Sequence, residues 1–441
     1  MRMRANRGRL QLTHLTQRAL YRALAMPLLV ACSSNSVPPP AEPGNGVDSG
    51  SGASDGGSSG GGDSTVGDAS VDASVPEAAA AAANEASPGT DVSEFVYPVN
   101  LDAGSDATPP PPVPQSCMTA GPGISDCAPD GGSCCAGSIL PEGNLLRSYD
   151  GITPGYTNPS FLATVGSLWL DKYEITVGRY RRFVNAVVGG WQPAAGSGKH
   201  SHLNAGLGLQ VAGVQGANEA GWDTSWNATL STTADAWNTA LACDPVAQTW
   251  TSTAGANEDL PANCMTWYEA YAFCIWDGGF LPSEAEWNYA ASGGAEQRVY
   301  PWSVPATSAT IDCSHANYYG AMMGTDSCVS PDIDATDDFT GMTNAVGSES
   351  PEGDGKWGQS DLAGNVFEWN LDWYAPYVVP CSNCASLTDA SMDDASTTAA
   401  TRVIRGGAFD NQATFLLASV RKSYGPASRT SSVGARCARA P

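Results

Sequence analysis

Histidines are the first side chains of this sequence that could carry metal chemistry. Three lie in the part of the chain with globular composition, and His200 and His202 are separated by one residue, while His315 stands alone. A set of imidazoles with open coordination positions suits Fe(II) and its oxygen chemistry. The His200–His202 pair falls in a loop-like stretch, however, and we expect a solvated loop there rather than an iron site.

Two acidic side chains, Glu284 and Glu286, invite an acid–base interpretation. Ser283 and Glu286 nevertheless have the spacing of a capping box that opens a helix over 284–291. The dipole of such a helix favours acids in its first turn. We therefore assign both glutamates to structure.

The elements that would position these side chains are few. One helix is expected after Thr176, with an apolar face that ends at Gly189, and another over 267–277. Segments 169–175 and 402–405 are the best strand candidates. Arg402, Arg405 and Arg436 are expected to pair with the abundant acids. Long irregular stretches between these elements predict a domain that needs covalent cross-links.

Cysteines supply such cross-links. Twelve follow Cys32, an even number, which in an exported chain predicts a disulfide framework. Proximity suggests the pairs Cys243–Cys264 and Cys313–Cys328, and a small knot within 117–135. Cys381-Ser-Asn-Cys384 has zinc-ligand spacing, but no further ligands stand nearby, so a disulfide is favoured over zinc.

The beginning of the chain has the pattern of an export signal. A basic stretch precedes an apolar run that closes on Leu29-Val-Ala-Cys32, similar to a bacterial lipobox. We expect residues 1–32 to be a signal peptide and Cys32 to become a lipid anchor in the membrane. An ordinary signal peptide is the alternative. Ser33, rather than an aspartate, favours the outer membrane or cell surface over the inner membrane.

Residues 33–115 consist of Ser, Gly, Ala, Pro and Asp, with few large apolar side chains. Such a segment cannot bury enough surface to offset its ordering entropy, so we expect a disordered tether. The formal net charge of −24 argues against a nucleic-acid partner. Acidity in an exported protein indicates solubility or oxygen ligands for a hard cation.

The remaining chain resembles the formylglycine-generating enzyme family, also called sulfatase-modifying factor domains. The resemblance covers about 169–439, and many motifs occur in the family's order. In chain order they are LDKYEIT at 170–176, NCMTWYEAYAFCIWDGGFLPSEAEWNYAASGG at 263–294, YPW at 300–302, VGS at 346–348, GKWGQSDLAGNVFEWNLDWY at 355–374, RVIRGGAF at 402–409 and VGARCAR at 433–439.

This resemblance implies an α+β fold that is related to C-type lectins, has little regular secondary structure and is held together by disulfides. The family-like domain would span 161–441, with an insertion at about 191–262. A cysteine-rich annex at 116–160 would precede it. The family also pairs the cysteine of the 267–277 helix with one near the end of the domain, which implies a structural Cys274–Cys437 disulfide.

The sequence lacks one requirement of the chemistry that the resemblance implies. The family's oxidases bind Cu(I) through two thiolates five residues apart, because soft thiolates select Cu(I). The matching positions here are Asn411 and Leu416, and a serine of the same motif is Ala408. Trp369 matches a residue that lines the copper site, but it is equally a core residue. Copper or iron is therefore not expected as a cofactor.

Calcium is the cofactor that the resemblance supports. Hard Ca²⁺ takes six or more oxygen ligands, and the family builds structural calcium sites from carbonyls, Asn and acids. A simpler interpretation is that Asn365 and Glu368 only hydrogen-bond a tight turn. The matching positions form two sets, Asn317, Tyr318, Asp337 and Phe339 in one, and Gly364, Asn365, Val366 and Glu368 in the other.

The sequence thus predicts an exported, lipid-anchored family member without copper-oxidase activity that acts as a calcium-stabilised binding or scaffold module. A peptide or glycan in the family's groove would be its partner. The alternative is an oxidoreductase, either a formylglycine-generating oxidase acting on a protein cysteine or a non-haem iron enzyme. His200 and His202 would serve the latter, although the three-histidine spacing of the family's sulfoxide synthases is not reproduced.

Overall fold

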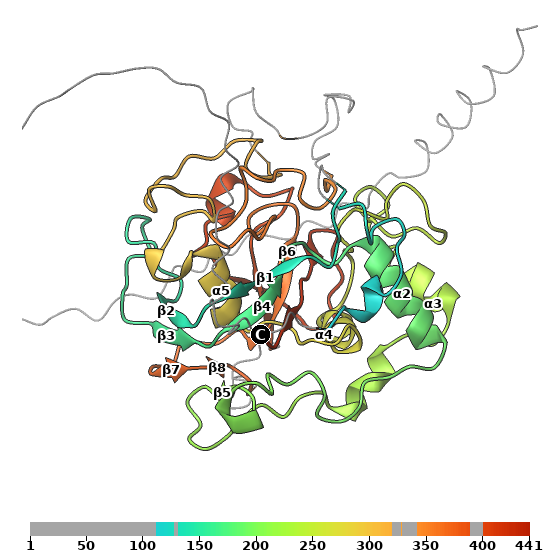
Figure 1. The fold of residues 1–441 in the computed structure, drawn as a ribbon, viewed down its shortest axis with the longest axis horizontal. Coiled ribbons are helices and arrows are strands. Elements are labelled where there is room, and N and C mark those ends of the chain that lie inside the picture. The colour runs from blue at the N-terminus through green and yellow to red at the C-terminus, as the bar shows by residue number, and fades with distance from the viewer. Residues whose placement is uncertain (1–111, 128–130, 320–327, 329–341, 389–399) are drawn as a thin grey trace, which may run out of the picture. The chain divides into compact units, whose positions relative to one another are not determined.

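Short elements joined by long loops make up the described part of the chain. The structure is a computed structural model that describes residues 112–127, 131–319, 328, 342–388 and 400–441, and these residues contain four α-helices and four small β-sheets. The helices are α2 (Val177–Val188), α3 (Ala234–Ala240), α4 (Trp267–Trp276) and α5 (Glu284–Ala291). In Figure 1, α2 and α3 lie side by side, away from β2 and β3.

Three of the sheets contain three or four strands, and the fourth is a pair. Their strand orders are β1-β4-β12, β10-β9-β6-β11, β2-β3-β7 and β5-β8. The bounds are β1 (Gly137–Leu140), β2 (Gly143–Leu146), β3 (Leu162–Val165), β4 (Leu168–Asp171), β5 (Gln210–Val211), β6 (Phe367–Trp373), β7 (Cys381–Ser382), β8 (Cys384–Ala385), β9 (Arg402–Arg405), β10 (Lys422–Tyr424), β11 (Val433–Gly434) and β12 (Ala438–Arg439).

The helix starts follow from local sequence. Thr176 accepts a hydrogen bond from the Arg179 amide ahead of α2. Both predicted capping boxes are present, Thr266 with Glu269 on α4 and Ser283 with Glu286 on α5. Each box satisfies backbone donors that a helix start leaves unpaired. The predicted strand at 402–405 is β9, whereas the other candidate is strand only over β4.

The largest core cluster is aromatic and lies between α2, α3 and α4. Tyr180, Phe183 and Phe273 are fully buried there, with ring centroids 5.5 to 5.9 Å apart. Trp237 of α3 meets Tyr180 edge-on at 6.1 Å. Because α3 belongs to the 191–262 segment, side chains of this insertion are part of the core.

The N-terminal annex is integrated with the sheets. Its two disulfides, Cys117–Cys135 and Cys127–Cys134, close the expected knot. However, β1 and β2 also fall within 116–160, and they pair with β4 and β3. A domain boundary at residue 160 therefore does not match the strand pairing.

A buried charge network also ties the annex to the helices. The Ser116 amide donates to Asp277 at 2.6 Å, and Arg179 contacts both the Ser116 hydroxyl and Asp277. Arg439 of β12 reaches Asp277 and Asp171. The annex, α2 and the last strand thus meet at one cluster of fully buried charges.

Four further disulfides cross-link the domain: Cys243–Cys264, Cys274–Cys437, Cys313–Cys328 and Cys381–Cys384. The Cys274–Cys437 bridge joins α4 to the residue before β12 across 163 positions of sequence. A search of the described helices for one long and apolar enough to cross a membrane finds no candidate. Residues 1–111, which include the expected signal peptide, Cys32 and most of the expected tether, lie outside the described residues.

Candidate functional site

The loop after β9 carries Asn411 and Leu416, the two positions that the resemblance matches to the copper ligands of a family oxidase. Gly406 and Gly407 follow Arg405 with φ of 103° and 76°, a backbone region that strains residues with a side chain. A Cβ on Gly407 would lie 2.6 Å from the Leu416 side chain. Leu416 itself is fully buried in an apolar cluster with Val299 and Tyr300. Leu416, matched by the resemblance to the second copper ligand, is thus a core-packing residue.

The first copper position has a polar side chain. Asn411 is half-buried, and its Oδ1 is buried without a hydrogen-bond partner among the described residues. Ala408 is fully buried and accepts the Asn411 amide through its carbonyl. Trp369 is also fully buried and donates from Nε1 to the Met265 carbonyl. An amide and a leucine offer no soft ligand, so this loop does not fit Cu(I).

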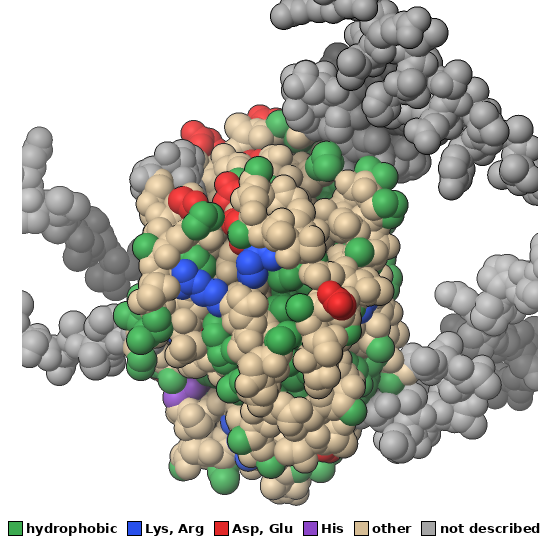
Figure 2. Space-filling view, turned by 90° about the vertical axis from the view of Figure 1, so that its right-hand side faces the viewer, with side chains coloured by type: hydrophobic (Ala, Val, Ile, Leu, Met, Phe, Trp, Pro, Cys, Tyr) green, Lys and Arg blue, Asp and Glu red, His purple; other side chains and the backbone are tan. Residues whose placement is uncertain are grey.

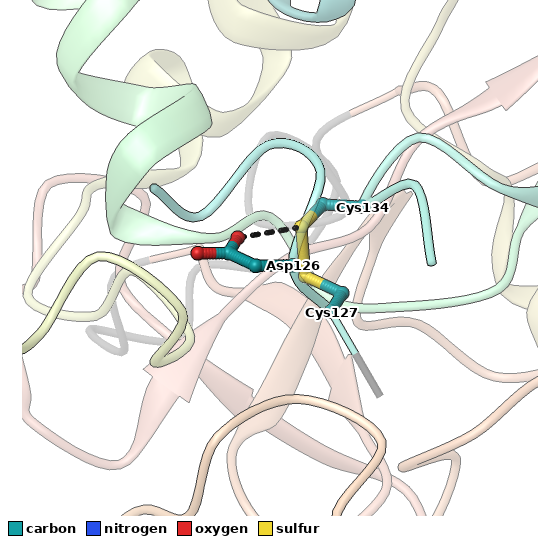
Figure 3. Close-up of side chains that lie close together, drawn as sticks. All are labelled: Asp126, Cys127 and Cys134. Carbon is teal, nitrogen blue, oxygen red and sulfur yellow. Dashed lines mark hydrogen bonds between the residues drawn. A yellow bond between two sulfur atoms is a disulfide. The ribbon is translucent and has the colours of Figure 1, made fainter. Parts of the chain in front are cut away.

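Cysteines elsewhere in the described part do not compensate. All twelve described cysteines form the six disulfides. Within the described ranges, one group of three potential metal-binding side chains comes together, namely Asp126, Cys127 and Cys134. Figure 3 shows the bond between the two sulfur atoms and the contact between the Asp126 carboxylate and Cys134. The Asp126 Oδ1–Cys134 Sγ distance is 3.9 Å. A disulfide sulfur is not a thiolate, so this group is not a metal site.

The expected calcium ligands are mostly engaged with protein groups. Asn365 has a left-handed backbone, donates to Glu174 at 2.7 Å and accepts from the Asn317 amide and the Asn344 backbone. Glu368 is buried and accepts from Arg436 through both oxygens. The backbone of Val366 donates to Glu174 at 3.1 Å. Asp337 and Phe339, the other half of the first set, lie outside the described residues.

Beside this turn, the structure reveals carboxylates that the sequence did not single out. Glu349 is almost fully buried, and its Oε2 has no partner among described residues. Burial, and then the nearby Glu349, raise the pKa of Asp361 to about 7. Burial, followed by Asp361 and Glu368, raises the pKa of Glu174 well above its ordinary value.

Burial disfavours the charged form of each of these acids, and neighbouring carboxylates add to this effect for Asp361 and Glu174. Gly364 and Val366 belong to the adjacent turn. A sequence signal existed for Asp361, which starts the DLAGN motif, but none marked Glu349 or Glu174 as neighbours of that motif.

His200 corrects one sequence expectation. It does not lie in a solvated loop but is fully buried. Its Nδ1 lies 3.0 Å from Glu219, and its Nε2 lies 3.0 Å from Glu286 of α5. Burial alone would lower the pKa of His200, but Glu286 and Glu219 raise it to about 10. The ring is therefore a buried imidazolium that holds the insertion against the start of α5.

The surroundings of the three histidines bear on the hypothesis of a non-haem iron site. Both nitrogens of His200 face carboxylates, so neither offers a free lone pair. His202 lies near it, with ring centroids 6.3 Å apart, and stacks on Phe280. Burial lowers the pKa of His202. His315 instead pairs with Asp312 at 2.7 Å and packs against Trp302.

The remaining sequence candidates behave as structural partners. Glu284 is buried and pairs with Arg405 and Arg421, each at 2.6 Å. Burial would raise the pKa of Glu284, but Arg421 and Arg405 hold it below its ordinary value. Arg402 lies between the rings of Trp267 and Trp373. A carboxylate held by two guanidinium groups is a poor proton acceptor, so the acid–base interpretation finds no support.

On the face shown in Figure 2, uncharged polar and apolar side chains predominate, with few Lys or Arg. This face has few Lys or Arg side chains because several arginines of the domain are buried. Arg179, Arg405, Arg436 and Arg439 are all buried against acids.

The chain is similar in sequence to enzymes of known type. The formylglycine-generating enzyme of Streptomyces coelicolor is 31% identical over 198 residues, covering 43% of this chain and 57% of that protein. The mouse inactive C-alpha-formylglycine-generating enzyme 2 is 34% identical over 119 residues, covering 27% of this chain and 34% of its own. The chain thus spans about half or less of the length of these curated relatives.

A solved structure of PvdO from Pseudomonas aeruginosa aligns with 73% of this chain and all of its own, at 20% identity and a TM-score of 0.42. The family model described as a sulfatase-modifying factor enzyme 1-like domain matches residues 130–441. That match includes all four helices and the loop with Asn411 and Leu416. The chain belongs to the sulfatase-modifying factor family, whose members include the formylglycine-generating enzymes.

Proposed function

We propose that this protein is an exported, lipid-anchored member of the family that lacks copper-oxidase activity and acts as a calcium-stabilised binding or scaffold module. The observation that supports the proposal is the loop after β9, where Asn411 and a core-packed Leu416 stand at the positions that the resemblance matches to the two copper-binding thiolates. That one relative is named an inactive enzyme agrees with such a loss within the family.

The proposed lack of copper-oxidase activity can be tested directly. Purified protein would be incubated with Cu(I), oxygen and a cysteine-containing peptide of the type that formylglycine-generating enzymes oxidise. We expect no mass change to the aldehyde, because the loop offers no thiolate. The double variant Asn411→Cys/Leu416→Cys serves as a matched comparison for Cu(I) binding. Aldehyde formation by the wild-type protein would refute the proposal.

Calcium binding has a separate test. The protein would be exported, purified without chelators and analysed for metals. We expect about one or two calcium ions per chain, with loss of one site in Glu349→Gln or Asp361→Asn. Stoichiometric iron that is lost in His202→Ala would instead favour the oxidoreductase alternative.

The anchor and the partner are tested independently of the metal. Lipidation predicts that labelled palmitate is incorporated by the wild type and not by Cys32→Ala. Fractionation would then place the wild type in the outer membrane or at the surface. A peptide and glycan screen on the folded domain would identify the partner, and no binding in either class would refute the binding-module part of the proposal.

A further inference from the structure

The Cys381–Cys384 disulfide lies at a junction between two sheets. Cys381 is in β7, which extends the β2-β3-β7 sheet, whereas Cys384 is in β8, whose partner is β5 of the insertion. Among the described disulfides, this one joins strands of two different sheets. The four-residue loop therefore connects the central part of the domain to the insertion.

The backbone between the two cysteines makes both connections. Asn383 has a left-handed backbone, donates its amide to the Thr164 carbonyl beside β7 and accepts the Gly166 amide through Oδ1. Its own carbonyl accepts the Gln210 amide of β5 at 2.8 Å. The geometry of this one residue, which the disulfide encloses, thus sets where β5 pairs.

The pairing of β5 with β8 is short. Both strands are two residues long, and the backbone hydrogen bonds at their flanks include those from Gln210 to Asn383 and from Ala212 to Ala385. The insertion is also held elsewhere, at His200 and through Trp237 of α3. Strands this short open locally at low cost, and a covalent ring of four residues restricts the open state.

The bridge is placed where a small reductant can reach it after such an opening. Cys381 and Cys384 are 4% and 5% exposed, and the preceding Val378 and Val379 are 38% and 47% exposed. By contrast, Cys274 and Cys437 have no exposure. The S–S bond that fixes β5 is therefore closer to solvent than the bond that closes the domain.

We propose that Cys381–Cys384 is a redox-responsive joint that couples the thiol–disulfide state of the surroundings to the pairing of β5 with β8. A dithiol reductant attacks one sulfur as a thiolate, and the other sulfur leaves as a thiolate and takes a proton from water. The second thiol of the reductant then displaces the first cysteine. The protein gains two thiols, and the reductant leaves as a cyclic disulfide, so two electrons and two protons pass to the protein.

The experiment uses the full chain under native conditions. The protein is treated with increasing dithiothreitol, trapped with N-ethylmaleimide and mapped by peptide mass spectrometry, while hydrogen–deuterium exchange is followed over 203–213. We expect Cys381 and Cys384 to be labelled while Cys274 and Cys437 stay bridged. Exchange over 203–213 should rise roughly tenfold and return to its starting rate on reoxidation.

Two variants make the test specific. Cys381→Ser/Cys384→Ser should show the fast exchange over 203–213 without reductant. Cys313→Ser/Cys328→Ser removes another short-range disulfide that does not touch β5, and its exchange over 203–213 should equal that of the wild type. Equal exchange in reduced and oxidised wild type, or labelling of Cys274 and Cys437 first, would overturn the proposal. The wild-type measurement decides the matter if a variant does not fold.

Discussion

The buried imidazolium of His200 makes a quantitative prediction about stability. In His200→Ala, Glu219 and Glu286 each lose a charge partner at 3.0 Å while remaining buried. Breaking a buried ion pair by removing one partner costs about 3–5 kcal/mol. The pKa shift gives a similar figure, because a rise from 6.5 to about 10 corresponds to about 5 kcal/mol at about 1.4 kcal/mol per unit.

The pH dependence has a definite sign. The pKa of His200 is raised in the folded state, so its contribution is complete below about pH 6.5 and is lost as the pH rises toward 10. The difference in free energy of unfolding between wild type and His200→Ala should therefore shrink between pH 7 and 9, by about 1.4 kcal/mol per pH unit.

Guanidinium unfolding of both proteins at pH 7, 8 and 9 measures this difference. His202→Ala is the matched control, because burial lowers the pKa of His202 and, among the described residues, no carboxylate forms a salt bridge with its ring. Its effect should not shrink with rising pH. A loss below about 1 kcal/mol for His200→Ala at pH 7, or a difference that is constant with pH, would refute the charged-ring account.

Three further predictions concern other parts of the fold. Removing the Cys274–Cys437 bridge by substituting Ala for both cysteines should lower the free energy of unfolding by about 5 kcal/mol, the value of the chain-entropy relation for a loop this long. Guanidinium unfolding measures this loss, and a loss near 1 kcal/mol would contradict the prediction. Arg436→Gln removes the charge partner of the buried Glu368 and should lower the free energy of unfolding by about 3–5 kcal/mol. Thermal and chemical unfolding would detect this loss. With chelator present, the raised pKa of Asp361 should make the free energy of unfolding fall from pH 5 to 7, by about 1.4 kcal/mol per pH unit. Added calcium, or the variant Asp361→Asn, should remove this dependence on pH. An unchanged dependence in the presence of calcium would speak against a cation beside Asp361.

Sequence reasoning succeeded where the physical cause is local. The capping boxes of Thr266 and Ser283 depend on residues three positions apart, and the structure has both. The strand at 402–405 was also recognisable, since its four residues are all buried in the centre of a sheet.

It failed where partners are far apart in the chain. His200 becomes a core residue because Glu286, 86 positions later, comes to its ring, and a loop-like sequence carries no sign of that. Glu349 and Asp361 likewise meet only in the fold. The annex was separated from the domain by its cysteine pattern, although β1 and β2 pair with strands on the other side of residue 160.

Residues 437–439 have a consequence for how the protein is made. Cys437 closes the bridge to α4, Ala438 pairs with Leu170 and Phe280, and Arg439 neutralises Asp171 and Asp277. Before residues 437–439 are made, β4 lacks its β12 partner and Cys274 lacks Cys437, while Asp171 and Asp277 have Arg179 but not Arg439. The closure of this domain is therefore expected to come late in folding, once residues 437–439 can reach α4 and β4.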